Sequence, residues 1–214
     1  MRPLAILGGT FDPVHNAHLR VAWEAAELLD AEVRLLPASV PPHRAQPVAT
    51  PAQRVALLAA ALAGQDRLRL DTRELDRAGP SWSIDTLIEL RAEIGPQRPL
   101  VLLVGADAFA GLASWHRWRE LFDQAHVGVL PRPGHTAALD AALERETRPR
   151  RVDTAAALRE APAGCVFEID VTPLDFSASR IRALLAEGRE PRYLVPDRVL
   201  ADPALLAPYR TAAD

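Results

Sequence analysis

The chain's 214 residues, of which 49% are hydrophobic, predict one globular domain spanning residues 1–214 rather than a disordered chain. A formal net charge of −3 disfavours non-specific nucleic-acid binding, and the absence of lysine among the 25 basic residues excludes Schiff-base chemistry, a lysyl-nucleotide intermediate and a P-loop. Short apolar runs, no leader-like segment before Leu4 and a single cysteine, Cys165, favour a cytoplasmic protein without a membrane partner.

Short apolar runs alternate with helical patterns along the chain. The predicted strands are Leu4–Leu7, Val33–Leu36, Leu68–Leu70, Leu100–Val104, Val127–Leu130 and Val166–Ile169. The predicted helices are Asn16–Leu29, Pro51–Ala63, Ser83–Ile94, Trp118–Gln124, Thr136–Glu146 and Ser177–Glu187. This alternation predicts an α/β fold whose parallel sheet is covered by helices on both faces, while Arg148–Gly164 gives no clear pattern. Ligands of such sheets bind beyond the carboxyl ends of the strands.

The first strand leads into the segment GGTFDPVHNAHL, residues 8–19. Gly8 and Gly9 allow a tight turn and a close approach of the backbone to a ligand. Asn16 is the expected cap of the helix that follows, which places His18 in its first turn. Amides at a helix start attract anions, and the imidazoles of His15 and His18 can donate hydrogen bonds to phosphate oxygens. The segment therefore indicates a phosphate site.

Spacing alone leaves two other interpretations of this segment open. Glycines after a strand and the pair Asp12-Pro13 are also common in purely structural turns. Two histidines three residues apart also occur in zinc sites, although no HExxH helix and no further Cys or His cluster accompanies them.

The same segment resembles the GGTFDPxHxGH signature of the adenylyltransferase branch of the nucleotidylyltransferase superfamily. Ala17 stands where the signature has its last glycine, and both histidines are kept. The resemblance implies a Rossmann-like, doubly wound sheet and binding of ATP by the two histidines.

A second candidate phosphate-binding motif, FSASRIRALLAEG, lies near residues 176–188. Ser177 or Ser179 is the expected helix cap, and arginines follow closely, which suits a triphosphate. A capped surface helix with solvated arginines is the alternative. The segment resembles the second signature of the superfamily, ISSTxIR, with Ser179 at the Ser/Thr position and Arg182 as the arginine.

Two segments after the second and third strands are candidates for a second substrate. VPPHR, residues 40–44, has two prolines that stiffen a loop presenting His43 and Arg44. RAGPSWSIDTL, residues 77–87, precedes a helix, and its local interpretation is a Ser83 cap with Trp82 in a hydrophobic staple.

Two more segments follow the fourth and fifth strands. GADAFAGLASWHRW, residues 105–118, places Asp107 where it can hold ribose hydroxyls. Its Trp115 is suited either to core packing or to stacking on a flat ring. PRPGH, residues 131–135, follows the fifth strand.

In this order the four segments resemble the PPH[KR], GxSYTxDTL-like, GxDxxxxLxxW and RPG motifs of bacterial nicotinate-nucleotide adenylyltransferases, over nearly the whole chain. Trp82 and Ser83 replace the usual Tyr-Thr. The resemblance implies transfer of AMP from ATP to nicotinate mononucleotide in NAD synthesis. It also implies Mg²⁺ as a cofactor that arrives with the ATP phosphates, and no metal site built from protein ligands.

The resemblance further implies roles for individual residues. The catalytic residues would be His15, His18 and Arg182. The ATP-binding residues would be Gly8, Gly9, Thr10, Phe11, His18, Gly105, Asp107, Ser179 and Arg182. The residues that bind nicotinate mononucleotide would be His43, Arg44, Trp82, Thr86, Trp115 and Arg132.

Three alternatives stay open. The nearest is an adenylyltransferase that uses phosphopantetheine or the amidated mononucleotide, although phosphopantetheine enzymes lack the middle motifs. The second is a nucleotide-binding regulator without turnover, and the third is a zinc-binding module. The sequence does not indicate an oligomeric state.

Overall fold

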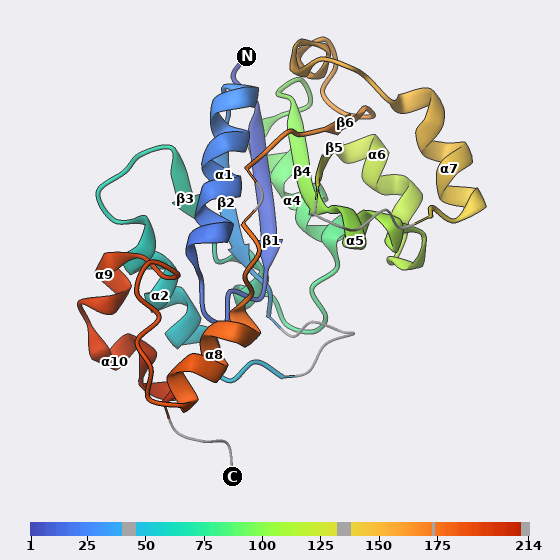
Figure 1. The fold of residues 1–214 in the computed structure, drawn as a ribbon. Coiled ribbons are helices and arrows are strands. Elements are labelled where there is room, and N and C mark those ends of the chain that lie inside the picture. The colour runs from blue at the N-terminus through green and yellow to red at the C-terminus, as the bar shows by residue number, and fades with distance from the viewer. Residues whose placement is uncertain (40–45, 132–137, 173, 211–214) are drawn as a thin grey trace.

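The computed structural model describes residues 1–39, 46–131, 138–172 and 174–210, and a parallel sheet lies at its centre (Figure 1). The strands are β1 (Leu4–Gly9), β2 (Glu32–Pro37), β3 (Leu68–Leu70), β4 (Leu100–Gly105), β5 (His126–Leu130) and β6 (Val166–Glu168). Their order in the sheet is β3-β2-β1-β4-β5-β6, and every pair is parallel. This is the order of doubly wound nucleotide-binding sheets, with the switch point between β1 and β4. The predicted fold class is confirmed.

Helices follow the strands and cover the sheet. The longer ones are α1 (Asn16–Leu29), α2 (Pro51–Leu62), α4 (Ser83–Ile94), α7 (Ala141–Thr147) and α8 (Ala178–Ala186). The shorter ones are α3 (Arg73–Asp76), α5 (Ala106–Ala110), α6 (Leu121–Gln124), α9 (Asp197–Leu200) and α10 (Pro203–Leu206). None of the helices in the described ranges is long and apolar enough to cross a membrane.

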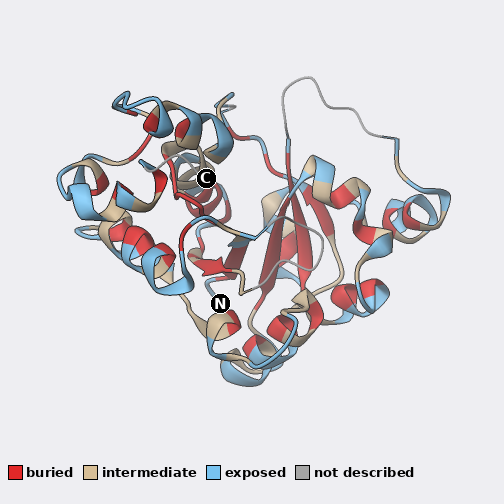
Figure 2. Ribbon diagram, turned by 90° about the horizontal axis from the view of Figure 1, so that it is seen from below, coloured by how far each residue is buried: buried red, intermediate tan, exposed pale blue. Residues whose placement is uncertain are grey.

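The sheet has a separate hydrophobic core on each face because successive side chains of a strand point to opposite sides. In β1, Ala5 and Leu7 belong to the core under α1, α2 and α8. Leu4 and Ile6 belong to the other core, which α4 and α6 cover. Figure 2 shows the resulting layers, with buried strands in the middle and helices whose outward faces are exposed.

The C-terminal part of the chain packs beside the carboxyl end of β1. In Figure 1, α8 lies below the end of β1, and α9 and α10 lie next to α2. Val195, Val199 and Leu206 are fully buried in the core that also holds Phe11 and Val14 of the first motif. The last helices therefore support the loop that follows β1.

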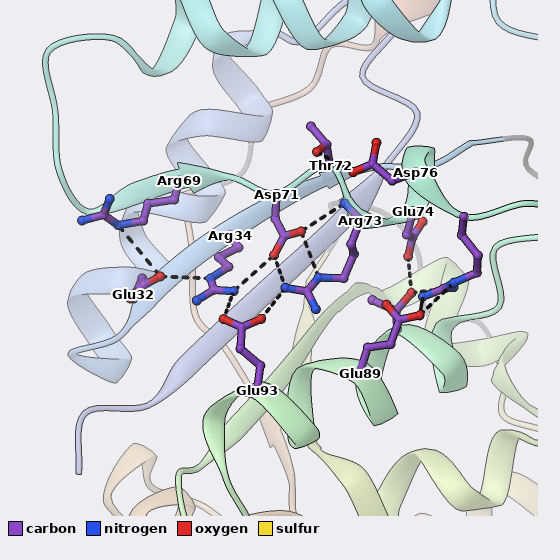
Figure 3. Close-up of polar contacts among 12 residues, drawn as sticks. Glu32, Arg34, Arg69, Asp71, Thr72, Arg73, Glu74, Asp76, Glu89 and Glu93 are labelled. Atoms are coloured by element: carbon purple, nitrogen blue, oxygen red, sulfur yellow. Dashed lines mark hydrogen bonds and ion pairs between the residues drawn. The ribbon is translucent and has the colours of Figure 1, made fainter.

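A network of ion pairs fixes α4 against the edge of the sheet (Figure 3). Arg34 of β2 and Arg73 of α3 both pair with Asp71, at 3.2 and 2.7 Å. Both arginines also reach Glu93 of α4, at 2.9 and 2.6 Å. The pKa of Asp71 is lowered because these contacts outweigh the burial that would raise it.

Some predicted elements are wrong in their extent. Of the expected helix Thr136–Glu146, the described part is helical only from Ala141, where the side chain of Asp140 caps the helix by accepting hydrogen bonds from Ala142 N and Leu143 N. Trp118–Gln124 is a 3₁₀ turn followed by α6, and Arg148–Gly164 contains two 3₁₀ helices. The sequence analysis did not identify α3, α5, α9 or α10, which have too few residues for a periodic pattern.

Candidate active site

The carboxyl ends of β1 and β4 form an open floor at the switch point. A methyl group added at Gly8 or Gly105 would meet no atom within 4 Å. At Gly9 it would lie 3.0 Å from the ring of Phe11, whose backbone takes a left-handed conformation with φ of 50°. Gly9 therefore lets the Phe11 ring pack against the backbone. These residues leave space above the sheet where parallel sheets bind ligands.

Two histidines lie at the start of α1, and His18 meets the Phe11 ring that packs on Gly9. The rings of His15 and His18 are stacked, with centroids 3.6 Å apart, and Phe11 meets His18 edge-on at 5.0 Å. His18 Nδ1 accepts a hydrogen bond from the backbone N–H of His15 at 3.3 Å. A neutral imidazole that accepts at Nδ1 carries its proton on Nε2, so His18 presents an N–H donor at its far end.

Both imidazoles are neutral near pH 7. Burial lowers the pKa of His15 from its ordinary value of 6.5 to about 4. Burial also lowers the pKa of His18, and the nearby ring of His15 lowers it further. The pair therefore offers hydrogen-bond donors rather than fixed positive charges to an incoming anion.

The predicted cap of α1 is wrong by one residue. His15 is the N-cap, and Asn16 is the first residue of the helix. Asn16 instead binds the C-terminal part of the chain: its backbone N–H donates to Leu194 O and its side-chain amide to Tyr193 O, both at 2.8 Å. His18 does lie in the first turn as expected, and Ala17 beside it is half-buried.

The second motif meets the first. Ser177 caps α8, and Phe176 just before it packs on the His15 ring at 5.4 Å between centroids. Arg182 Nη1 donates to the backbone carbonyl of Asp12 at 2.7 Å, and its Nη2 donates to Ser179 Oγ at 3.3 Å. The histidines and Arg182, separated by more than 160 residues, thus lie around one loop.

Arg54 is a residue of this region that the sequence analysis missed. Its side chain is fully buried, and its guanidinium donates to the backbone carbonyls of Thr10 at 2.9 Å and Ala38 at 2.8 Å. It thereby fixes the loops that follow β1 and β2. The signal was present: Arg54 falls on the buried face of α2 with Leu57 and Leu58, where an apolar residue is expected.

The candidate aromatic residues of the second substrate lie on the other face of the sheet. Trp82 and Trp115 are half-buried and pack against the core under α4. The Trp82 ring lies 5.0 Å from that of His116, the neighbour of Trp115, so the two segments meet. Asp107 is exposed in the first turn of α5, directly after β4.

The start of α4 differs from the expectation that Ser83 caps this helix. Trp82 is the N-cap and Ser83 the first helical residue, so Ser83 does not cap α4. Thr86 is 1% exposed; its hydroxyl donates to Glu74 at 2.9 Å and accepts from Arg77. Burial raises the pKa of Glu74, and its bond with Thr86 opposes that shift.

Three candidate residues, His43, Arg44 and Arg132, lie outside the described residues. Within the described ranges, no group of three or more His, Cys, Asp or Glu side chains is arranged to hold a metal ion.

The fold and the site together define a class: a doubly wound α/β protein with an open switch point, the place where sheets of this kind bind nucleotides. The family model for cytidylyltransferase-like proteins matches residues 6–184. Proteins described as probable nicotinate-nucleotide adenylyltransferases are similar to this chain over nearly its whole length. One from Halorhodospira halophila is 50% identical, covering 93% of this chain and 91% of the relative. One from Aeromonas hydrophila is 48% identical, covering 92% of each.

The chain therefore belongs to the cytidylyltransferase-like family and, within it, to the nicotinate-nucleotide adenylyltransferases. Solved structures share the fold. The nicotinic acid mononucleotide adenylyltransferase of Plasmodium falciparum complexed with NaAD has a TM-score of 0.67 and 14% identity, covering 94% of this chain and 96% of that one. Its complex with APC has a TM-score of 0.66.

Proposed function

We propose that this protein transfers AMP from ATP to nicotinate mononucleotide, producing nicotinate adenine dinucleotide and pyrophosphate for NAD synthesis. The observation that carries the proposal is the meeting of both phosphate motifs at the switch point, where Arg182 contacts the loop that leads to His15 and His18. Relatives described by this activity, similar over nearly the whole chain, support the same reaction.

The ATP phosphates would lie above Gly8 and Gly105, where the floor has no side chains. The backbone N–H groups of residues 9–11 and the hydroxyl of Thr10 would bind phosphate oxygens. His18 Nε2–H, steadied by the stacked ring of His15, would donate to the α-phosphate. Ser179 and Arg182 at the start of α8 would hold the β- and γ-phosphates.

The reaction needs no nucleophile from the protein. An oxygen of the mononucleotide's 5′-phosphate attacks the α-phosphorus, the bond from that phosphorus to the bridging oxygen breaks, and pyrophosphate leaves. The attacking oxygen is already ionised, so no general base is needed. Alignment and stabilisation of the charge on the five-coordinate phosphorus can supply the catalysis. Neutral N–H donors such as that of His18 suit this role.

The acceptor would bind on the α4 side of the same opening. Trp115 and Trp82 would frame the nicotinate ring, and the amides at the start of α4 would face its carboxylate. Thr86 would lie beneath the bound mononucleotide and support it indirectly, because its hydroxyl donates its hydrogen bond to Glu74. His43, Arg44 and Arg132 remain proposed ligands of the mononucleotide phosphate, and Asp107 of the ATP ribose.

Mg²⁺ is proposed to enter with ATP. The first-motif carboxylate, Asp12, already accepts hydrogen bonds from Val48 N, Ala49 N and Tyr209, so the residues fit an ion held mainly by phosphate oxygens and water. Such an ion supplies charge neutralisation on the phosphates.

The test is to incubate the protein with ATP, Mg²⁺ and a panel of phosphorylated acceptors and to measure pyrophosphate. Release with nicotinate mononucleotide supports the proposal. Release only with phosphopantetheine assigns a different adenylyltransferase. ATP binding without any release of pyrophosphate identifies the protein as a nucleotide-binding regulator. Stoichiometric zinc in the purified protein, with no ATP binding, identifies it as a zinc-binding module.

A further inference from the structure

Asp12 is a buried residue on which three other parts of the chain converge. Oδ2 accepts from Val48 N at 2.8 Å, and Oδ1 accepts from Ala49 N at 3.0 Å and from the hydroxyl of Tyr209 at 2.8 Å. Its backbone carbonyl accepts from Arg182 at 2.7 Å. A buried carboxylate is stable only when its oxygens are well supplied with donors.

Arg182 lies close enough to this carboxylate to bind it directly. Its Nη1 atom is 3.8 Å from Asp12 Oδ2, yet its hydrogen bond goes to the backbone carbonyl of Asp12 instead. The three donors from Val48, Ala49 and Tyr209 satisfy the carboxylate, so they reduce its attraction for the guanidinium. Arginine has five N–H donors, and the bonds to Asp12 O and Ser179 use two. The others remain for a ligand.

Tyr209 comes from the end of the chain. It belongs to the 3₁₀ turn Ala207–Tyr209, is 2% exposed, and lies beyond residues 6–184 that match the family model. Burial and its bond to Asp12 raise the pKa of its phenol, so Tyr209 stays protonated and donates. Its ring belongs to the core that includes Phe11, and its turn contacts α8 and α10.

We infer that Tyr209 is a positioning residue for the nucleotide site. Its hydroxyl donates a hydrogen bond to the Asp12 carboxylate and so keeps Arg182 directed toward the phosphates. This inference rests on the proposed binding of the ATP phosphates by Arg182. Without the hydroxyl, Asp12 Oδ1 keeps only the Ala49 N–H as a donor, and the guanidinium whose Nη1 lies 3.8 Å from Oδ2 becomes the replacement for the lost one. Arg182 would then turn away from ATP.

The first experiment compares Tyr209→Phe with the wild type, measuring kcat/KM for ATP and, without acceptor, the dissociation constant of ATP by calorimetry. Loss of one hydrogen bond to a charged group corresponds to roughly a tenfold weakening, which is expected in both quantities. Tyr193→Phe is the matched control, because Tyr193 is the other tyrosine and is 79% exposed. It should stay within about twofold of the wild type.

The second experiment repeats Tyr209→Phe in an Arg182→Ala background. If Tyr209 acts through Arg182, its removal now changes ATP binding by less than about twofold. An equal loss in both backgrounds would overturn the inference, since the hydroxyl would then act on the site as a whole. A Tyr209→Phe protein without native circular dichroism would overturn it too.

The same measurements separate this inference from the proposed function. A wild type that binds ATP but releases no pyrophosphate with any acceptor contradicts the proposed reaction, while the calorimetric comparison still tests Tyr209. A wild type that releases pyrophosphate, together with a Tyr209→Phe variant that binds ATP normally, overturns only the role of Tyr209.

Discussion

His15 and His18 stack ring upon ring, 3.6 Å between centroids and 19° between planes, at the start of α1. Two imidazolium ions at this separation would repel each other strongly. At most one ring of the pair can therefore take a proton when a phosphate binds. This arrangement favours hydrogen bonding over ionic attraction and leads to the first two predictions.

His18→Ala should fold but lose about 10²–10³-fold in turnover, the usual cost of removing one oriented donor to a developing charge. The measurement is the rate of pyrophosphate release. His126→Asn is the control for stability alone, because His126 is buried and its ring bonds Ala161 O and Cys165 N. That variant should be less stable yet turn over normally per folded molecule. Normal turnover by His18→Ala would remove His18 from the mechanism.

The free energy of unfolding of the ligand-free protein should decrease as the pH falls from 6.5 toward about 4. In this range His15 is neutral in the folded protein but protonated in the unfolded chain. Its pKa is about 4 in the folded protein and 6.5 when exposed, so the unfolded chain binds more protons between these values. Between about pH 7 and pH 5 this one group should remove roughly 2 kcal/mol from the free energy of unfolding.

Urea unfolding at both pH values tests this expectation in the wild type and in His15→Asn. The variant should lose less stability on acidification, because its side chain does not titrate. If both proteins respond equally to pH, then His15 is not held neutral by the fold.

Arg182→Ala should weaken ATP binding while preserving the fold, and Arg182→Lys should restore it only in part. A guanidinium can bond Asp12 O, Ser179 Oγ and a phosphate at once, whereas an ammonium is a point charge without that planar geometry. Calorimetric titration with ATP provides the measurement. Arg189→Ala, an exposed arginine beyond α8, serves as the control. Complete rescue by lysine would show that charge alone matters.

Nicotinate mononucleotide should be preferred over the amide form by at least about tenfold in kcat/KM. Donors aimed at two carboxylate oxygens leave the amide's NH₂ facing N–H groups, and each unsatisfied buried group costs about 1–3 kcal/mol. Trp115→Ala should raise the KM of the mononucleotide more than that of ATP. Both acceptors must be compared on one preparation. Equal use of the two would contradict the nicotinate assignment but not adenylyl transfer.

The sequence predicts the sheet and its long helices well because their signals are local. Asn16–Leu29 and Ser83–Ile94 have the predicted bounds, since each combines an apolar stripe with a clear end. Cap residues were harder to predict. His15 and Trp82 stand at the cap positions expected for Asn16 and Ser83. The backbone N–H of Asn16 donates to Leu194 O, a partner distant in sequence that no local pattern encodes.

The support of the site was least predictable. Arg54 and Tyr209 act on backbone carbonyls and on a carboxylate that are near only after folding. Residue type indicated the first motif and Arg182 as candidates. Their contact is a finding of the structure that the sequence analysis did not predict, and their roles in catalysis stay predictions.

The bond between Asp12 and Tyr209 joins residues 197 positions apart. A growing chain makes its first motif early, yet the carboxylate within that motif receives its last donor only after residue 209 has been made. Maturation of the nucleotide site thereby depends on the synthesis of a segment that follows both motifs, and a chain broken off before residue 209 would carry both signature motifs without their final support.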